Sequence, residues 1–173
     1  SNRFVIESRH QILEEMLTNF AADGLEMDFM RHPRYFQQGT ERKNAHFITE
    51  LLRQVRRIAD RIEKQQQRRV GLAVRVPPSV KLAERIGLDV TTWMQEELVD
   101  IVTVSNMDSS IDMDVESYLE ARRGDCKVYA CISAMPWWKS GTVLSSSAVG
   151  FNSFPSDEEF RGIAYNYWKR GVD

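Results

Sequence analysis

The strongest structural signal in the chain is Asp23-Gly24-Leu25-Glu26-Met27-Asp28-Phe29-Met30-Arg31-His32-Pro33. Its middle alternates apolar and acidic side chains with the two-residue period of a β-strand. On such a strand Glu26 and Asp28 point to one face, while the apolar residues between them point to the other. Acidic side chains on an inward strand face are costly unless they are paired or used. We therefore expect an active-site strand here.

Strands and helices alternate along the rest of the chain. The predicted strands cover about residues 25–30, 70–76, 100–105 and 127–133. The predicted helices cover about 8–22, 41–66, 79–86, 89–98, 115–123 and 156–170. The first of these places a stripe of apolar residues on one side, namely Ile12, Leu13, Met16, Leu17 and Phe20. This order is typical of right-handed βαβ units, so we expect the α/β class with a parallel sheet and outer helices.

Two parallel architectures fit this pattern, a segment of a (β/α)₈ barrel (TIM barrel) and a small doubly wound sheet. A glycine-rich phosphate turn after the first strand would favour the doubly wound sheet, and none is present. We therefore expect about four strands of a barrel, with no cofactor.

A similar short segment connects helix to strand at Ala22-Asp23-Gly24 and at Leu98-Val99-Asp100. The last three residues, Gly171-Val172-Asp173, resemble these connections. A fifth strand is therefore expected to follow Asp173, so that residues 1–173 form one incomplete barrel domain, truncated at both ends. The alternative is that Gly171 only caps the last helix.

Composition narrows the class of protein. The 173 residues are 42% hydrophobic and 28% charged, with a net charge of −2, as in an ordinary globular domain. Acidic residues interrupt the basic stretch between Arg42 and Arg69, which predicts a solvated helix face and no nucleic-acid partner. No run of about 18 apolar residues exists, so no membrane-spanning helix is expected. The oligomeric state stays open.

Sites in parallel α/β folds assemble at the carboxyl ends of the strands. The candidate catalytic residues there are Asp28 and Glu26. The candidate substrate-binding residues are Arg31, His32, Tyr35, Arg75, Ser105, Asn106, Trp137 and Trp138. Hydrolysis of a glycosidic bond uses two carboxyl groups, and aromatic faces stack on sugar rings. This set therefore predicts a carbohydrate substrate.

Each element also has a simpler interpretation. Glu26 is equally explained as a structural acid paired with Arg75, and His32 as a loop residue bonded to backbone. The two tryptophans are equally explained as closing a loop over the barrel. Three aspartates follow the third predicted strand, namely Asp108, Asp112 and Asp114. The segment lacks the glycine and the terminal glutamate of a calcium loop, so no metal site is expected there.

Several segments together resemble family 10-like glycosyl hydrolase domains. They are Asp23–Pro33, Gly71–Pro77, Gly87–Val90 with Trp93, Val99-Asp100, Ser156–Glu159, Tyr165–Trp168 and Gly171–Asp173. The resemblance spans nearly the whole chain and implies strands four to seven of a bacterial (β/α)₈ barrel, with glycoside hydrolase activity. It also implies a secreted or periplasmic location.

Two features depart from related catalytic patterns. Met30 occupies the position where the similar strand of family 18 chitinases has its proton donor, which argues against chitinase chemistry. The predicted strand 127–133 lacks the glutamate expected at the end of strand seven. Glu26 and Asp28 lie about 6.6 Å apart along one strand and line one wall. They cannot flank a sugar bond from both sides by themselves, so this strand is expected to supply half of an active site. The alternatives are a non-catalytic sugar-binding barrel and an unrelated α/β enzyme.

Overall fold

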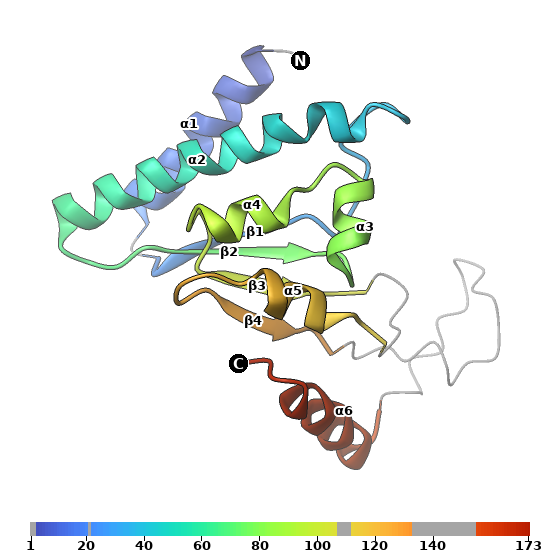
Figure 1. Ribbon diagram of the computed structural model, residues 1–173. Coiled ribbons are helices and arrows are strands. Elements are labelled where there is room, and N and C mark those ends of the chain that lie inside the picture. The colour runs from blue at the N-terminus through green and yellow to red at the C-terminus, as the bar shows by residue number, and fades with distance from the viewer. Residues whose placement is uncertain (1–2, 21, 107–111, 133–154) are drawn as a thin grey trace, which may run out of the picture.

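The computed structural model describes residues 3–20, 22–106, 112–132 and 155–173 (Figure 1). Its four strands are Gly24–Asp28 (β1), Gly71–Val76 (β2), Ile101–Val104 (β3) and Lys127–Ala130 (β4). Its helices are Arg3–Asn19 (α1), Glu41–Gln66 (α2), Val80–Arg85 (α3), Val90–Gln95 (α4), Val115–Ala121 (α5) and Asp157–Lys169 (α6). The strands form one parallel sheet in the order β1-β2-β3-β4, which confirms the α/β class.

Helices cover one face of this sheet. Each strand pairs with the next one in sequence, and right-handed crossovers then place α2, α4 and α5 on the same side (Figure 1). The β2 side chains that point to this side, Leu72, Val74 and Val76, are fully buried. Those of Val74 and Val76 pack in one apolar cluster with Leu52 of α2 and Trp93 of α4. The main core therefore lies between the sheet and its helices.

The opposite face of the sheet carries polar side chains. The register aligns Glu26, Ala73, Ile101 and Lys127 in one row across the four strands. A second row, nearer the carboxyl ends, contains Asp28, Arg75, Thr103 and Tyr129. Every one of these side chains is half-buried or exposed, so this face is the less covered of the two.

Helix boundaries follow the capping signals in the sequence. Asp89 caps α4 by accepting a hydrogen bond from Thr92 N at 3.1 Å. Ser156 and Glu159 form the predicted capping box of α6. The first strand ends at Asp28, earlier than predicted, because the Asp28 carboxylate rather than a neighbouring strand accepts from Met30 N.

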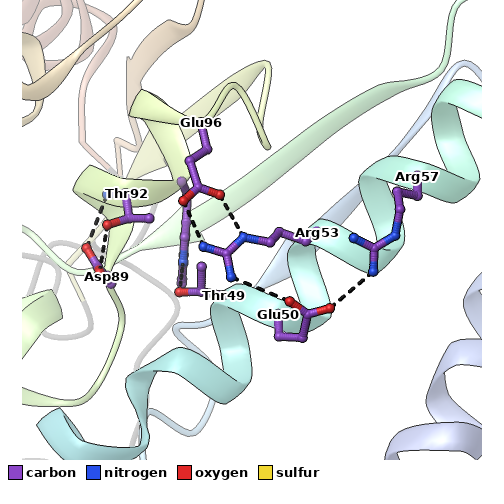
Figure 2. Close-up of polar contacts among 8 residues, drawn as sticks. Thr49, Glu50, Arg53, Arg57, Asp89, Thr92 and Glu96 are labelled. Carbon is purple, nitrogen blue, oxygen red and sulfur yellow. Dashed lines mark hydrogen bonds and ion pairs between the residues drawn. The ribbon is translucent and has the colours of Figure 1, made fainter.

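The basic face of α2 makes ion pairs at the surface. Figure 2 shows the Arg53 guanidinium directed at Glu96, the residue that follows α4, with both of its bonds to that carboxylate at 2.7 Å. Glu50 accepts from Arg53 on one side and from Arg57 on the other (Figure 2). Arg53 therefore joins α2 to the end of α4, whereas the contact of Arg57 with Glu50 lies within α2.

The predicted apolar stripe of α1 is only partly buried. Leu17 is 1% exposed and packs against α2, whereas Ile12, Met16 and Phe20 are 56%, 43% and 64% exposed. These three residues point away from the described core. Within the described ranges, no helix has both the length and the apolar character needed to cross a membrane.

Candidate functional site

The candidate site is built on a chain of hydrogen bonds across three neighbouring strands. Asp28 is the last residue of β1, and the register places it opposite Arg75 of β2. Arg75 donates from Nη1 to Asp28 Oδ2 at 3.2 Å and from Nη2 to Ser105 Oγ at 2.8 Å. Ser105 follows directly after β3, so the three side chains meet at the carboxyl ends of the strands.

Asp28 acts as an acceptor through both carboxylate oxygens. Oδ2 faces the Arg75 guanidinium, and Oδ1 accepts from Met30 N at 2.7 Å. Both oxygens of Asp28 are thus occupied as acceptors, one toward β2 and one toward the loop that follows β1.

Arg75 is held firmly but incompletely. Two of its three guanidinium nitrogens have partners, while Nε is buried and has no acceptor among the residues that the structure describes. An orphaned buried donor costs free energy. The side chain therefore keeps its position beside Asp28 and Ser105 at some expense of stability.

Glu26 lies one row below this chain of bonds. The register sets it opposite Ala73, and its side chain is exposed on the less covered face of the sheet. Its interpretation as the structural partner of Arg75 is wrong, because Arg75 pairs with Asp28. Glu26 is thus left on the same wall as Asp28.

The loop after β1 is fixed at its base by an aromatic anchor. Tyr35 donates from its hydroxyl to Phe29 O at 2.7 Å, and the two rings meet edge to face at 5.7 Å. Phe29 also contacts Trp93 of α4, at 5.3 Å between ring centroids. Burial, and to a lesser degree the charge of Asp28, raises the pKa of Tyr35 to about 12. Tyr35 therefore stays a hydrogen-bond donor across the ordinary pH range.

Arg31 and His32 lie in this loop, three and four residues after Asp28 in the sequence, and both are exposed. Arg34 is a further exposed basic residue there, and it was not among the predicted site residues. The sequence could have indicated Arg34 as a site residue by its position, because it stands three residues after Arg31 and next to Pro33.

Ser105 and Asn106 serve the architecture of the site. Ser105 is 1% exposed, so its hydroxyl supports Arg75 and is closed to solvent. Asn106 donates from Nδ2 to Asp112 O at 3.3 Å and so holds the segment that follows β3. Ser105 therefore positions Arg75, and the contact of Ser105 and Asn106 with a substrate stays a prediction.

Two predicted residues, Trp137 and Trp138, lie outside the described residues, as does Asp108. Among the residues that are described, no group of three His, Cys, Asp or Glu side chains is arranged to hold a metal ion. The structure thus brings together Asp28, Arg75 and Ser105, with Tyr35 beside them, at one end of the sheet.

No protein-family model matches the chain, and a search of curated proteins finds no match either.

Proposed function

We propose that the chain is part of a carbohydrate-active (β/α)₈ barrel, a glycoside hydrolase with Asp28 in its active site. The observation that carries the proposal is the chain of bonds from Asp28 through Arg75 to Ser105 across three strand ends. Catalytic residues of such barrels lie at the carboxyl ends of several strands, where this group lies.

The topology supports a barrel over a doubly wound sheet. A doubly wound sheet has a switch point where the strand order reverses, whereas the order of β1 to β4 follows the sequence throughout. Helices cover one face, and polar residues such as Asp28, Arg75 and Thr103 line the other. In a closed barrel that second face becomes the interior.

Asp173 supports the proposal that the sheet has further strands. Asp100, just before β3, donates from its N–H to Leu72 O at 2.8 Å and accepts from Leu72 N at 2.7 Å. Asp173 repeats both contacts on β4, with Val128 O at 2.9 Å and Val128 N at 3.0 Å. Asp173 therefore stands where a residue that leads into the next parallel strand would stand.

In the proposed reaction Asp28 is the nucleophile or the carboxylate that stabilises the oxocarbenium-like transition state. Its two accepted hydrogen bonds fit this role better than that of the acid. Glu26 projects from the same strand and the same wall, so it cannot face Asp28 across a sugar bond. A carboxyl group on another strand is therefore the expected partner of Asp28. Arg75 fixes the orientation of Asp28.

The test is the activity of the full-length protein on glycans with Asp28→Asn. We expect kcat to fall by about a thousandfold or more, because the variant lacks the reacting charge. Asp125→Asn is the matched control, since Asp125 is exposed and lies before β4 at the opposite end of the strand from the site. Unchanged activity in Asp28→Asn would refute the assignment.

A non-catalytic sugar-binding barrel is the second candidate. The neutralisation of Asp28 by Arg75 favours it, because a paired carboxylate is also a good acceptor for sugar hydroxyls. Glycan binding that persists in Asp28→Asn and in Glu26→Gln, with no turnover in the wild type, would select this candidate.

A further inference from the structure

The loop after β1 presents more positive charge than its surroundings neutralise. Arg31 and Arg34 are exposed, and neither of them has an acidic partner within the described part of the chain. Most arginines of α2, by contrast, are paired, as Arg53 is with Glu96 and Arg56 with Asp100. Arg31 and Arg34 are thus free to contact a ligand, in the loop that begins at the Asp28 end of β1.

This loop is built to hold a position. Its base is fixed by the bond from the Tyr35 hydroxyl to Phe29 O at 2.7 Å, and by the packing of Phe29 on Trp93. A turn within it is closed by Arg34 N and His32 O at 2.7 Å. The two arginines therefore emerge from a fixed backbone next to Asp28, which reduces the entropy lost when they bind a ligand.

The acidic residues at this end of the sheet do not pair with Arg31 or Arg34. Asp28 is engaged by Arg75. Asp114 caps α5 through Ser117 N, and Asp112 belongs to the same segment after β3, two strands away from the loop. Glu26 lies one row below, toward the amino end of β1. The β1 side of the site is consequently electropositive.

We propose that Arg31 and Arg34 bind a carboxylate group of the substrate, so that the site selects uronate-containing glycans over neutral ones. The inference rests on the proposed glycan-binding function. A guanidinium presents a planar set of donors that matches the two oxygens of a carboxylate. A neutral sugar hydroxyl offers no charge for such a contact.

The experiment compares matched ligands on the full-length protein. Uronate-containing oligosaccharides are presented on an array, each beside its carboxyl-reduced counterpart, which differs only in the loss of the acid. We expect the acidic member to bind about fivefold more tightly for each arginine engaged, and this preference to weaken as salt is added.

The variant Arg31→Gln with Arg34→Gln is expected to remove the preference, so that each acidic glycan binds no more tightly than its carboxyl-reduced counterpart. Arg57→Gln is the control, because Arg57 is an exposed arginine on the outer helix α2. Equal binding of acidic and reduced glycans, or a preference that survives in the double variant, would overturn this inference alone. If no glycan of either kind binds, the proposed function fails as well.

Discussion

Gly24 lies at a close approach of β1 and β2. It pairs with Gly71 at the start of both strands, and a Cβ atom placed on it would lie 2.3 Å from Gly71 O. The neighbour is backbone, which cannot rotate away as a flexible side chain does. A side chain at this position therefore pushes the first two strands apart.

We predict that Gly24→Ala lowers the free energy of unfolding by about 1–3 kcal/mol, as overpacking does. Gly162→Ala is the matched control, because nothing lies within 4 Å of a Cβ there and alanine favours the helix by about 0.5–1 kcal/mol. Urea denaturation measures both. A Gly24→Ala variant as stable as the wild type would contradict the close approach of the two strands.

The site shows, residue by residue, what a strand pattern can predict. Alternation correctly placed Glu26 and Asp28 on one face, because the period of a strand fixes the face. It did not fix the register, and a two-residue difference in register decides whether Arg75 meets Asp28 or Glu26. Ser105 was assigned to the substrate because it ends a strand, but its burial under Arg75 depends on packing that no local pattern encodes.

At the scale of elements, Asp100 joins α2, β2 and β3. Its carboxylate accepts from Leu72 N at 2.7 Å and from Arg56 Nη2 at 2.6 Å. Burial raises the pKa of Asp100, but these two hydrogen bonds outweigh it and hold the pKa below its usual value. The folded protein thus binds a proton at this carboxyl less readily than the unfolded chain does.

A carboxyl group with a lowered folded pKa stabilises the protein above the unfolded value of about 3.9. This contribution is lost as the pH falls through the folded pKa. We predict that Asp100→Asn lowers the free energy of unfolding by about 1–2 kcal/mol near neutral pH. The difference from the wild type should shrink as the pH falls below about 4, because the wild-type carboxyl group then takes up a proton.

Asp60→Asn is the control for this measurement, since Asp60 contacts the same Arg56 but at 3.7 Å and with half of its side chain exposed. It should change stability by less than about 0.5 kcal/mol. Denaturant titrations at a series of pH values give the comparison. The explanation fails if Asp100→Asn keeps a constant deficit down to the acid end of the series.

The elements themselves were mostly predictable from the sequence. The range of α2 was predicted to the residue. Its long amphipathic pattern identifies the helix, and a change of composition marks each of its ends. The sequence predicted an apolar stripe on one side of α1, and within that stripe Ile12, Met16 and Phe20 are exposed. Periodicity identifies an apolar face, but it does not identify the element that covers it.

For the whole molecule, the order of elements in the sequence was enough to predict a parallel sheet with helices outside it. It was not enough to predict how α6 is attached. The polar contacts that connect α6 to the rest come from residues at its end, among them Arg170 and Asp173, whose partners are more than forty residues away. Such pairs depend on the three-dimensional arrangement and leave no local signal in the sequence.

We predict that α6 opens as a separate unit when its contacts at Arg170 are removed. Arg170 donates to Met113 O at 2.6 Å and to Glu116 of α5, and Ile163 and Tyr167 supply the apolar part of the contact. In Arg170→Gln the amides of α6 should exchange about tenfold faster with deuterium, while those of β2 keep the wild-type rate. Lys169→Gln is the matched control, because Lys169 only lies over the Tyr165 ring, at 5.5 Å from its centroid. Faster exchange in β2 as well would show that α6 and the sheet unfold together, because opening of α6 alone leaves the hydrogen bonds between the strands intact.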